Sequence, residues 1–379
     1  MTALAIAFWI SAGLIVYTHV GYPLLLRVLA APRGAPAAAQ DSEPAVSLIV
    51  AAHDESDLIA RKVRNALELD YPPGKLELIV ASDGSADGTV AAAREAAGED
   101  ERVTVLDLPR QGKVRAQDTS VERATGEVVA FSDANAFWDP GALRALVQPF
   151  ADPRVGYVCG RLTYLAPDGS NQEGAYWRYE NAVRLSESRV ASVTAGNGAI
   201  YAVRREAYMR LDPRTSHDLS FPFNMVKRGW RALYEPAANA VERPVATIEG
   251  EFRRKRRMMS HAWPAVLGGG MLDPRGYGLL YAFEIFSHRA VRYATPFLHV
   301  VALAANVALL GKGWVYAVTL AAQLALLAGA ALAGPLRGRP RPLALCRYYV
   351  LVTASLAAGL WDWARRGTPA TWEREAERG

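Results

Sequence analysis

Cysteine is scarce in this sequence of 379 residues, which contains only Cys159 and Cys346. The two lie far apart, and neither is near a second cysteine or a histidine at a metal-ligand spacing, which argues against a disulfide framework and a zinc site. There is no internal repeat, and the only biased segments are rich in alanine. The net charge of +5 comes from arginines beside apolar runs and from one basic cluster, which indicates contact with a membrane surface and not with nucleic acid.

Charged residues are absent from Thr2 to Leu26, a run of 25 residues. A helix needs roughly 20 apolar residues to cross a bilayer, so this run predicts an N-terminal transmembrane helix within residues 1–30. A cleaved signal peptide would carry its cations before the apolar run, whereas Arg27 and Arg33 follow it. Because basic residues stay inside, these arginines place the central part of the chain in the cytoplasm.

Charge is also absent from two stretches near the other end, Tyr293 to Gly311 with 19 residues and Gly313 to Leu336 with 24. These predict two further spans joined by a tight turn at Lys312. The last apolar stretch, Tyr348 to Trp361, has 14 uncharged residues, a length typical of a re-entrant or interfacial helix. Whether residues 342–364 cross the membrane stays open, so two to three C-terminal membrane helices are expected.

The central part alternates short apolar runs with helical spacing. The predicted strands are Val46 to Ala51, Leu76 to Ala81, Val103 to Leu108 and Val128 to Phe131, with helices over 58–69 and 89–97. This alternation indicates an α/β, Rossmann-like, mostly parallel sheet that binds ligands at the carboxyl ends of its strands. The expected organisation is a transmembrane helix at 1–30, a linker at 31–44, the α/β domain at 45–267, an interfacial amphipathic segment at 268–292, membrane helices at 293–364 and a cytosolic tail at 365–379.

Polar residues follow the predicted strands where a ligand would bind. Asp83 lies in a turn of Asp, Ser and Gly residues, which alone is also typical of a helix cap. Asp133 and Asn135 are two residues apart, and both can face one Mg²⁺ or Mn²⁺ ion. Residues 110–113 put two cations around a glycine, which suits a diphosphate, although such a tetrapeptide also occurs in ordinary surface loops.

Taken together, the ordered motifs resemble those of an inverting family 2 glycosyltransferase with the GT-A fold. They are Val46 to Ser56, Ser82-Asp83-Gly84-Ser85-Ala86-Asp87-Gly88-Thr89, Gly112-Lys113, Gly126-Glu127, Phe131-Ser132-Asp133-Ala134-Asn135, Gly196-Asn197-Gly198-Ala199-Ile200-Tyr201, His217-Asp218, Gly229-Trp230 and the basic segment Glu251 to Met258. The resemblance covers roughly 46–267. With its flanking membrane helices, the chain is similar to the polysaccharide synthases that include cellulose, hyaluronan and poly-N-acetylglucosamine synthases.

The resemblance implies a role for each matching residue. Asp218 would be the general base that removes a proton from the acceptor hydroxyl. The donor nucleotide sugar would be bound by Glu55 and Asp83 at the nucleoside, by Lys113 in the diphosphate loop, by Asp133 and Asn135 through Mg²⁺ or Mn²⁺, and by Arg254 and Arg257 at the diphosphate. The chemistry agrees, since a carboxylate can activate a hydroxyl while a metal and guanidinium groups stabilise the leaving diphosphate.

Three departures from the family pattern affect these expectations. Asn135 replaces the second acid of the metal motif, and His217 replaces the acid before the base. For His217 a hydrogen-bonded role that orients the loop is expected, with proton transfer as the alternative. The segment from Arg254 to Met258 lacks the tryptophan that accompanies chain synthesis in the relatives, which leaves repeated addition open.

The leading hypothesis is therefore a multi-pass enzyme of the cell membrane with a cytoplasmic catalytic domain. It would transfer a hexose or an N-acetylhexosamine, with a UDP-sugar as the expected donor, to a growing surface glycan or a glycolipid. Membrane lipids and partner subunits for synthesis or export are the expected contacts. Two alternatives stay open: a single addition to a polyprenyl phosphate or another lipid carrier, and a catalytically degenerate scaffold that binds a nucleotide sugar.

Overall fold

The computed structural model describes residues 2–33, 42–165, 175–243, 247–334 and 341–369. The chain divides into two compact units, which are referred to below as the helical unit and the sheet unit. The helical unit comprises Met1–Leu25, Val245–Leu272 and Phe283–Thr368, and the sheet unit comprises Leu26–Pro244, Asp273–Ala282 and Pro369–Gly379.

The sheet unit is built on one eight-stranded sheet, with the order β3-β2-β1-β4-β7-β6-β8-β5. Its strands are β1 (Val46–Ala52), β2 (Leu76–Asp83), β3 (Val103–Leu108), β4 (Val128–Asp133), β5 (Phe137–Trp138), β6 (Val155–Tyr164), β7 (Tyr201–Arg204) and β8 (Arg231–Glu242). Strands β1 to β4 pair in parallel, as do β6 and β8. Strand β7 is antiparallel to both of its neighbours, and β5 is antiparallel to β8. The predicted α/β fold is confirmed, with a mixed sheet in which the four predicted strands form one parallel group.

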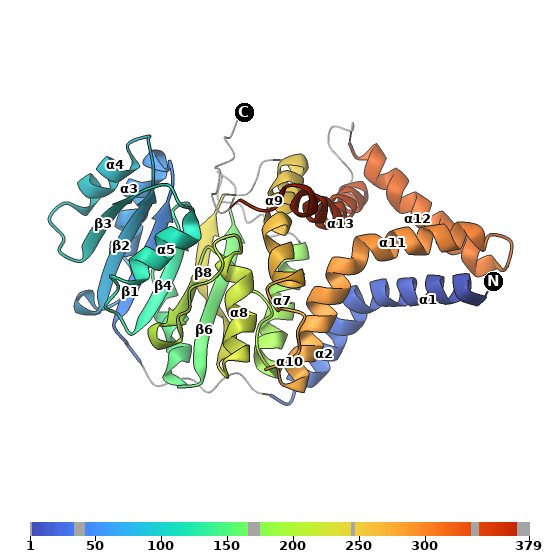
Figure 1. Ribbon diagram of the computed structural model, residues 1–379, viewed down its shortest axis with the longest axis horizontal. Coiled ribbons are helices and arrows are strands. Elements are labelled where there is room, and N and C mark those ends of the chain that lie inside the picture. The colour runs from blue at the N-terminus through green and yellow to red at the C-terminus, as the bar shows by residue number, and fades with distance from the viewer. Residues whose placement is uncertain (1, 34–41, 166–174, 244–246, 335–340, 370–379) are drawn as a thin grey trace. The chain divides into compact units, whose positions relative to one another are not determined.

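Both faces of the sheet are covered, because successive side chains of a strand point to opposite sides. Leu48 and Val50 of β1 pack in one buried cluster, while Ile49 between them packs in another. The first cluster includes residues of α3 (Ser56–Leu67), α4 (Thr89–Ala97) and α6 (Ala142–Val147), and the second is bordered by α5 (Lys113–Val121) and α8 (His217–Lys227). Figure 1 shows α5 lying over one face of the sheet. A further helix of this unit is α7 (Ala175–Val190).

The helical unit contains the apolar helices. Its elements are α1 (Thr2–Val16), a π-helical turn (Tyr17–Gly21), α9 (Ile248–Leu267), a second π-helical turn (Ile285–Ala290), α11 (Val291–Ala308), α12 (Trp314–Leu332) and α13 (Arg341–Arg366). The short helices α2 (Tyr22–Ala30) and α10 (Leu279–Glu284) belong partly to each unit. Three helices of the described residues are long and apolar enough to cross a membrane: Thr2–Ala30, Trp314–Leu332 and Arg341–Arg366.

Two of the three C-terminal apolar stretches, 293–311 and 348–361, form helices whose bounds differ from the uncharged runs. The predicted span 293–311 is helix α11, but it is not among the three helices that are long and apolar enough to cross a membrane, since Arg292, His299 and Asn306 interrupt its apolar character. The stretch 348–361, for which crossing of the membrane was left open, is the middle of the 26-residue helix α13. Helix α13 continues through Arg347 and Asp362 because α9 supplies opposite charges for both.

Helix α9 packs along α13 in the helical unit. Arg256 Nε lies 2.6 Å from Asp362 Oδ2, and Arg347 Nη2 lies 2.6 Å from Glu249 Oε1. The indole N–H of Trp263 donates to the backbone carbonyl of Leu356 at 2.9 Å. These contacts join α9 to the apolar helices by charge and by packing.

In the sheet unit, α3 holds the segment that follows β4. Asn65 donates from Nδ2 to the carbonyl of Trp138 and accepts from the Trp138 N–H through Oδ1, both at 2.9 Å. This pair of bonds satisfies two backbone groups with one side chain. The position of residues 133–138 at the sheet edge therefore depends on a helix that begins 77 residues earlier in the chain.

We expect Asn65→Ala to lower the free energy of unfolding by about 1–3 kcal/mol, since it leaves buried backbone groups without partners. Denaturant unfolding of the full chain in detergent, followed by tryptophan fluorescence, measures the change. Arg64→Ala is the matched control, because Arg64 is exposed on the same helix and its loss should cost less than about 0.5 kcal/mol. Equal effects of the two changes would contradict the anchoring role of Asn65.

Candidate functional site

The predicted ligand edge of the sheet gathers loops from five parts of the chain. Strands β1, β2 and β4 run in register and end together, with Ala51 opposite Asp133 and Ala52 opposite Ser82. Strand β7 begins at the same edge, because Tyr201 pairs with Phe131 near the end of β4. The loops that meet there cover residues 53–55, 84–88, 109–112, 134–136 and 195–200.

Glu55 lies at this edge, immediately before α3. Its N–H donates to Thr89 Oγ1 at 2.8 Å, which ties the loop after β1 to the start of α4. The N–H of Ser56 donates to Asp87 at 3.0 Å. Burial alone would raise the pKa of Asp87, but the hydrogen bonds from Thr89 and Ser56 outweigh it and lower that pKa to about 2. Glu55 is therefore half-buried where the loop after β1 is hydrogen-bonded to the loop before α4.

The carboxylate of Asp83 is buried and shapes the loop after β3. Its Oδ1 accepts from the N–H of Gln111 at 2.7 Å and from that of Gly112 at 3.0 Å. Gly84 allows this close approach: it has φ of +63°, and a Cβ there would lie 2.8 Å from the Cβ of Arg110. In the structure Asp83 holds the loop after β3. Its contact with a nucleoside stays a prediction.

Lys113 and Asp133 form an ion pair between the loop after β3 and the end of β4. Each side chain is 20% exposed, so the pair lies at the surface of the edge. Asn135 is exposed two residues further along. Gly198 lies beside the pair, since a Cβ there would be 3.4 Å from both Asp133 Oδ2 and Lys113 Nζ.

The Gly-Asn-Gly segment connects that ion pair to Asp218. Asn197 is buried; it accepts from the N–H of Ala199 at 3.1 Å and donates to the carbonyl of Gly160 at 2.6 Å. The N–H of Gly196 donates to the carbonyl of Asp218 at 2.8 Å. Asp218 itself is half-buried in the first turn of α8, where the helix dipole favours a carboxylate.

His217 is buried among aromatic rings behind the edge, with the ring of Phe221 4.6 Å away. The Tyr201 hydroxyl is hydrogen-bonded to His217 Nδ1 at 2.8 Å, and the amide of Gln117 donates to the same hydroxyl at 3.2 Å. Burial, with a smaller contribution from the charge of Lys113, lowers the pKa of His217 to about 3. This neutral, hydrogen-bonded ring fits the orienting role expected for His217.

Lys62 is a residue of the site that the sequence reasoning missed. It is fully buried, and its Nζ donates to the carbonyl of Ala136 at 2.5 Å and lies 5.2 Å from the Trp138 ring. Burial lowers its pKa to about 7, although the negative charge of Asp133 acts in the opposite direction. A signal was available, because Lys62 is three residues after Ile59 and shares the apolar face of α3.

Arg254 and Arg257 lie on α9 in the helical unit, whereas the other predicted site residues lie in the sheet unit. Arg254 pairs with Glu251 through Nε at 2.8 Å and Nη2 at 2.9 Å, and Lys255 lies 3.4 Å from the same carboxylate. Burial would raise the pKa of Glu251, but the bonds from Arg254 and the charge of Lys255 keep it lowered. The contact of these arginines with a donor stays a prediction.

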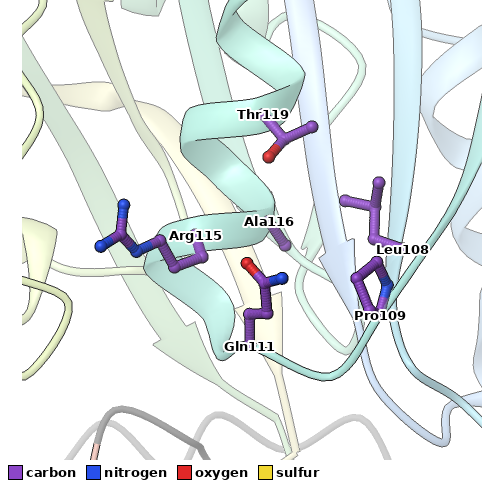
Figure 2. A pocket seen from close by; sticks show the side chains of 6 residues that line it. All are labelled: Leu108, Pro109, Gln111, Arg115, Ala116 and Thr119. Atoms are coloured by element: carbon purple, nitrogen blue, oxygen red, sulfur yellow. The ribbon is translucent and has the colours of Figure 1, made fainter.

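Two hollows are described in the sheet unit. One, of about 220 Å³, lies between α5 and the end of β3, with Gln111 and Arg115 near the start of the helix (Figure 2). Its lining residues are Leu108, Pro109, Gln111, Arg115, Ala116 and Thr119. The other, of about 400 Å³, is lined by Glu127, Arg204, Arg205 and Glu206. Neither is lined by Asp133 or Asp218, so the acids of the candidate site lie outside both hollows.

The low pKa of His217 predicts a pH-dependent stability. Its folded pKa lies below the unfolded value of about 6.5, so the neutral ring stabilises the fold above that pH and the stabilisation is lost on acidification. We expect the free energy of unfolding to fall by about 2 kcal/mol between pH 7 and pH 5 from this group alone. Denaturant unfolding at the two pH values should show a smaller fall for His217→Gln. An unchanged fall would contradict the assignment.

Residues 47–232 match the family model of Glycosyl transferase family 2. The β-monoglucosyldiacylglycerol synthase of Trichormus variabilis is 34% identical over 160 residues, which are 41% of this chain and 34% of that protein. The poly-β-1,6-N-acetyl-D-glucosamine synthase of Staphylococcus aureus is 24% identical over 226 residues, which are 57% of this chain and 54% of that protein. The chain therefore spans about a third to a half of the length of these curated relatives.

A solved structure resembles nearly the whole chain. It is the mannosyltransferase PcManGT from Pyrobaculum calidifontis in complex with GDP-Man and Mn²⁺, with a TM-score of 0.72 and 26% identity over 95% of this chain and 99% of that chain. The family motifs, the sheet topology and these similarities agree, and the predicted family is confirmed. The chain contains a glycosyl transferase family 2 domain with the GT-A fold.

Proposed function

We propose that this chain transfers a hexose or an N-acetylhexosamine, with inversion, from a nucleotide sugar to a glycan or lipid-linked acceptor. One observation carries the proposal: the segment from Gly196 to Gly198 contacts Asp218 at one end and the Lys113–Asp133 pair at the other. The backbone of Asp218, whose carboxylate is able to take a proton, is thereby linked over three residues to the charges that suit a diphosphate.

The donor would lie along the carboxyl ends of β1, β2 and β4. At the diphosphate, Lys113 supplies a positive charge at the start of α5, where the helix dipole also favours an anion. The loop between β3 and α5 is held by Asp83, which accepts hydrogen bonds from the backbone of this loop, so the loop is in place before the donor binds. Glu55, where the loops after β1 and before α4 are hydrogen-bonded to each other, would face the nucleoside.

A divalent metal fits the residues present at this edge. Asp133 and Asn135 offer the carboxylate and amide oxygens that Mg²⁺ and Mn²⁺ bind. The described residues contain no group of three or more His, Cys, Asp and Glu residues that could hold a metal ion. When bound, the metal would supply positive charge that stabilises the leaving diphosphate; the resemblance to PcManGT, solved with Mn²⁺, supports this part of the proposal.

Asp218 would carry out the proton transfer. Its carboxylate takes the proton of the acceptor hydroxyl as that oxygen bonds to the anomeric carbon of the donor sugar. The bond from this carbon to the diphosphate oxygen breaks at the same time, and the nucleoside diphosphate leaves with the electron pair. This single displacement inverts the anomeric centre and requires no nucleophile from the protein. His217 keeps the start of α8 in place through its bond with Tyr201.

The acceptor is proposed to come from the membrane side. Three helices of the described residues are long and apolar enough to cross a bilayer. The arginines that follow the first of these helices favour an enzyme of the cell membrane whose catalytic domain lies in the cytoplasm. One relative is named for a glycolipid product and another for a polysaccharide. The glycolipid name and the absence of the chain-synthesis tryptophan favour a single addition to a lipid carrier as the second candidate.

Nucleotide release by the purified full chain tests the proposal. We expect UDP or GDP to be released from at least one of a panel of UDP- and GDP-sugars with Mg²⁺ or Mn²⁺, and release to stop with a chelator. Asp218→Asn should lower the rate at least about 100-fold, because a general base contributes that much or more. Mass analysis of the product would separate one addition from a ladder.

Asp212→Asn is the matched control for Asp218. Asp212 is an exposed acid six residues earlier that pairs with Arg214, and its loss should leave the rate within a factor of about three. Absence of release with every donor would favour the scaffold alternative. Full activity of Asp218→Asn would remove Asp218 from the role of base.

A further inference from the structure

The turn that follows β4 carries both residues proposed to bind the metal. The N–H of Ala136 donates to the carbonyl of Asp133 at 3.2 Å, which closes a β-turn with Ala134 and Asn135 at its centre. Asp133 is the first residue of this turn, so the separation of its carboxylate from the Asn135 amide depends on the backbone of the turn. A contact that fixes Ala136 therefore helps to fix both ligands.

Lys62 of α3 is bonded to the last residue of this turn. Its Nζ donates to the carbonyl of Ala136 at 2.5 Å, and its side chain is completely buried. The Trp138 ring lies 5.2 Å from the same nitrogen, a distance at which a cation and an aromatic ring attract each other. Lysine is almost never fully buried without a partner, and these two contacts supply one.

A second residue of α3 is bonded to the same stretch of chain. Asn65, three residues after Lys62, exchanges two hydrogen bonds with the backbone of Trp138. Residues three apart are neighbours on the surface of a helix, so one side of α3 holds this stretch at two points. Asn65 contacts the strand β5 that follows the turn, whereas Lys62 contacts the turn itself.

The same stretch is also connected to the segment beside Asp218. The indole N–H of Trp138 donates to the carbonyl of Ala199 at 3.0 Å, and Ser132 Oγ donates to the same carbonyl at 3.2 Å. Ala199 directly follows the segment from Gly196 to Gly198, which is bonded through Gly196 to the backbone of Asp218. A displacement of the turn after β4 would therefore reach the neighbourhood of the proposed base.

Stability does not explain why this residue is a lysine. A methionine has a similar length, and replacing buried charged groups by apolar ones of similar volume is often neutral or stabilising. Methionine lacks only the N–H donor for the Ala136 carbonyl. Ser132 Oγ also reaches this carbonyl, but at 3.5 Å, where a hydrogen bond is weak. The lysine is thus explained by the turn that it holds.

We propose that Lys62 is a positioning residue of the transfer reaction: by holding the Ala136 carbonyl, it fixes the turn in which Asp133 and Asn135 are placed to share one divalent ion. The part that concerns the metal rests on the proposed function, whereas the holding of the turn does not. Lys62 is fully buried and is not expected to touch the donor, the acceptor or the metal. Its loss would leave both ligands in the chain but no longer at a fixed separation.

Amide hydrogen exchange of the full chain in neutral detergent, followed by mass spectrometry, tests the holding of the turn without any ligand. In Lys62→Met we expect the peptide that covers residues 133–138 to exchange at least about tenfold faster than in the unsubstituted chain. Leu67→Ala is the matched control, because it removes packing from the same helix but no hydrogen bond to the turn. It should leave the exchange of this peptide within a factor of about two.

Binding of UDP and of GDP, measured by calorimetry at increasing Mn²⁺ concentration, tests the consequence for the metal. In Lys62→Met the Mn²⁺ concentration that half-saturates nucleotide binding should rise at least about tenfold, while turnover at saturating Mn²⁺ falls less than about threefold. A residue that only supported the fold would lower the fraction of active protein and leave the half-saturating concentration unchanged. Lys62→Gln, which keeps an N–H donor on a shorter side chain, should give intermediate values in both measurements.

Unchanged exchange of residues 133–138 in folded Lys62→Met, or an unchanged half-saturating Mn²⁺ concentration, would overturn the proposal. Nucleotide binding and release by the unsubstituted chain together with either of these results would overturn the positioning role alone. If the unsubstituted chain neither binds nor releases a nucleotide, the proposed function falls and the metal part of this proposal with it. Faster exchange in Lys62→Met would then still support the holding of the turn.

Discussion

Charge balance around Asp133 is the constraint on which the rest of the site depends. The carboxylate lies at the end of a central strand, where parallel neighbours bring further acids to the same edge. Lys113 pairs with it at the surface, and the ammonium of Lys62 lies behind it in the interior and acts on it electrostatically. Because each lysine comes from a different helix, the helices α3 and α5 are both tied to the end of β4.

The loops of this edge are held by buried polar groups and not by their own packing. Asp83 uses its carboxylate to hold two backbone N–H groups, and Asn197 uses its amide to hold the segment beside Asp218. Asn65 does the same for the chain after β4. Such groups are costly to bury unless each finds its partner, so they favour one arrangement of the loops. The catalytic geometry proposed for Asp218 thus depends on residues that are not expected to touch a substrate.

The fold was predictable where local patterns suffice. Strands β1 to β4 begin at the residues that their apolar runs indicated, since a buried parallel strand is a short run of apolar residues between polar loops. The full length of helix α13 was not evident from its uncharged run, because Arg347 and Asp362 interrupt that run and their partners Glu249 and Arg256 lie about 100 residues away in the chain. The burial of Lys62 is a similar case: helical spacing placed it on the apolar face, and its type suggested solvent.

The sequence by itself determined the family, the order of strands and loops in the parallel half of the sheet, and the identity of the acids at its edge. These follow from local periodicity and from motifs that are contiguous in the chain. Only the tertiary structure decided that Asp83 holds a loop and that His217 is neutral in an aromatic core. The physical reason is that burial, and with it the charge state and the hydrogen-bond partners of a side chain, depends on residues that are distant in the sequence and adjacent in space.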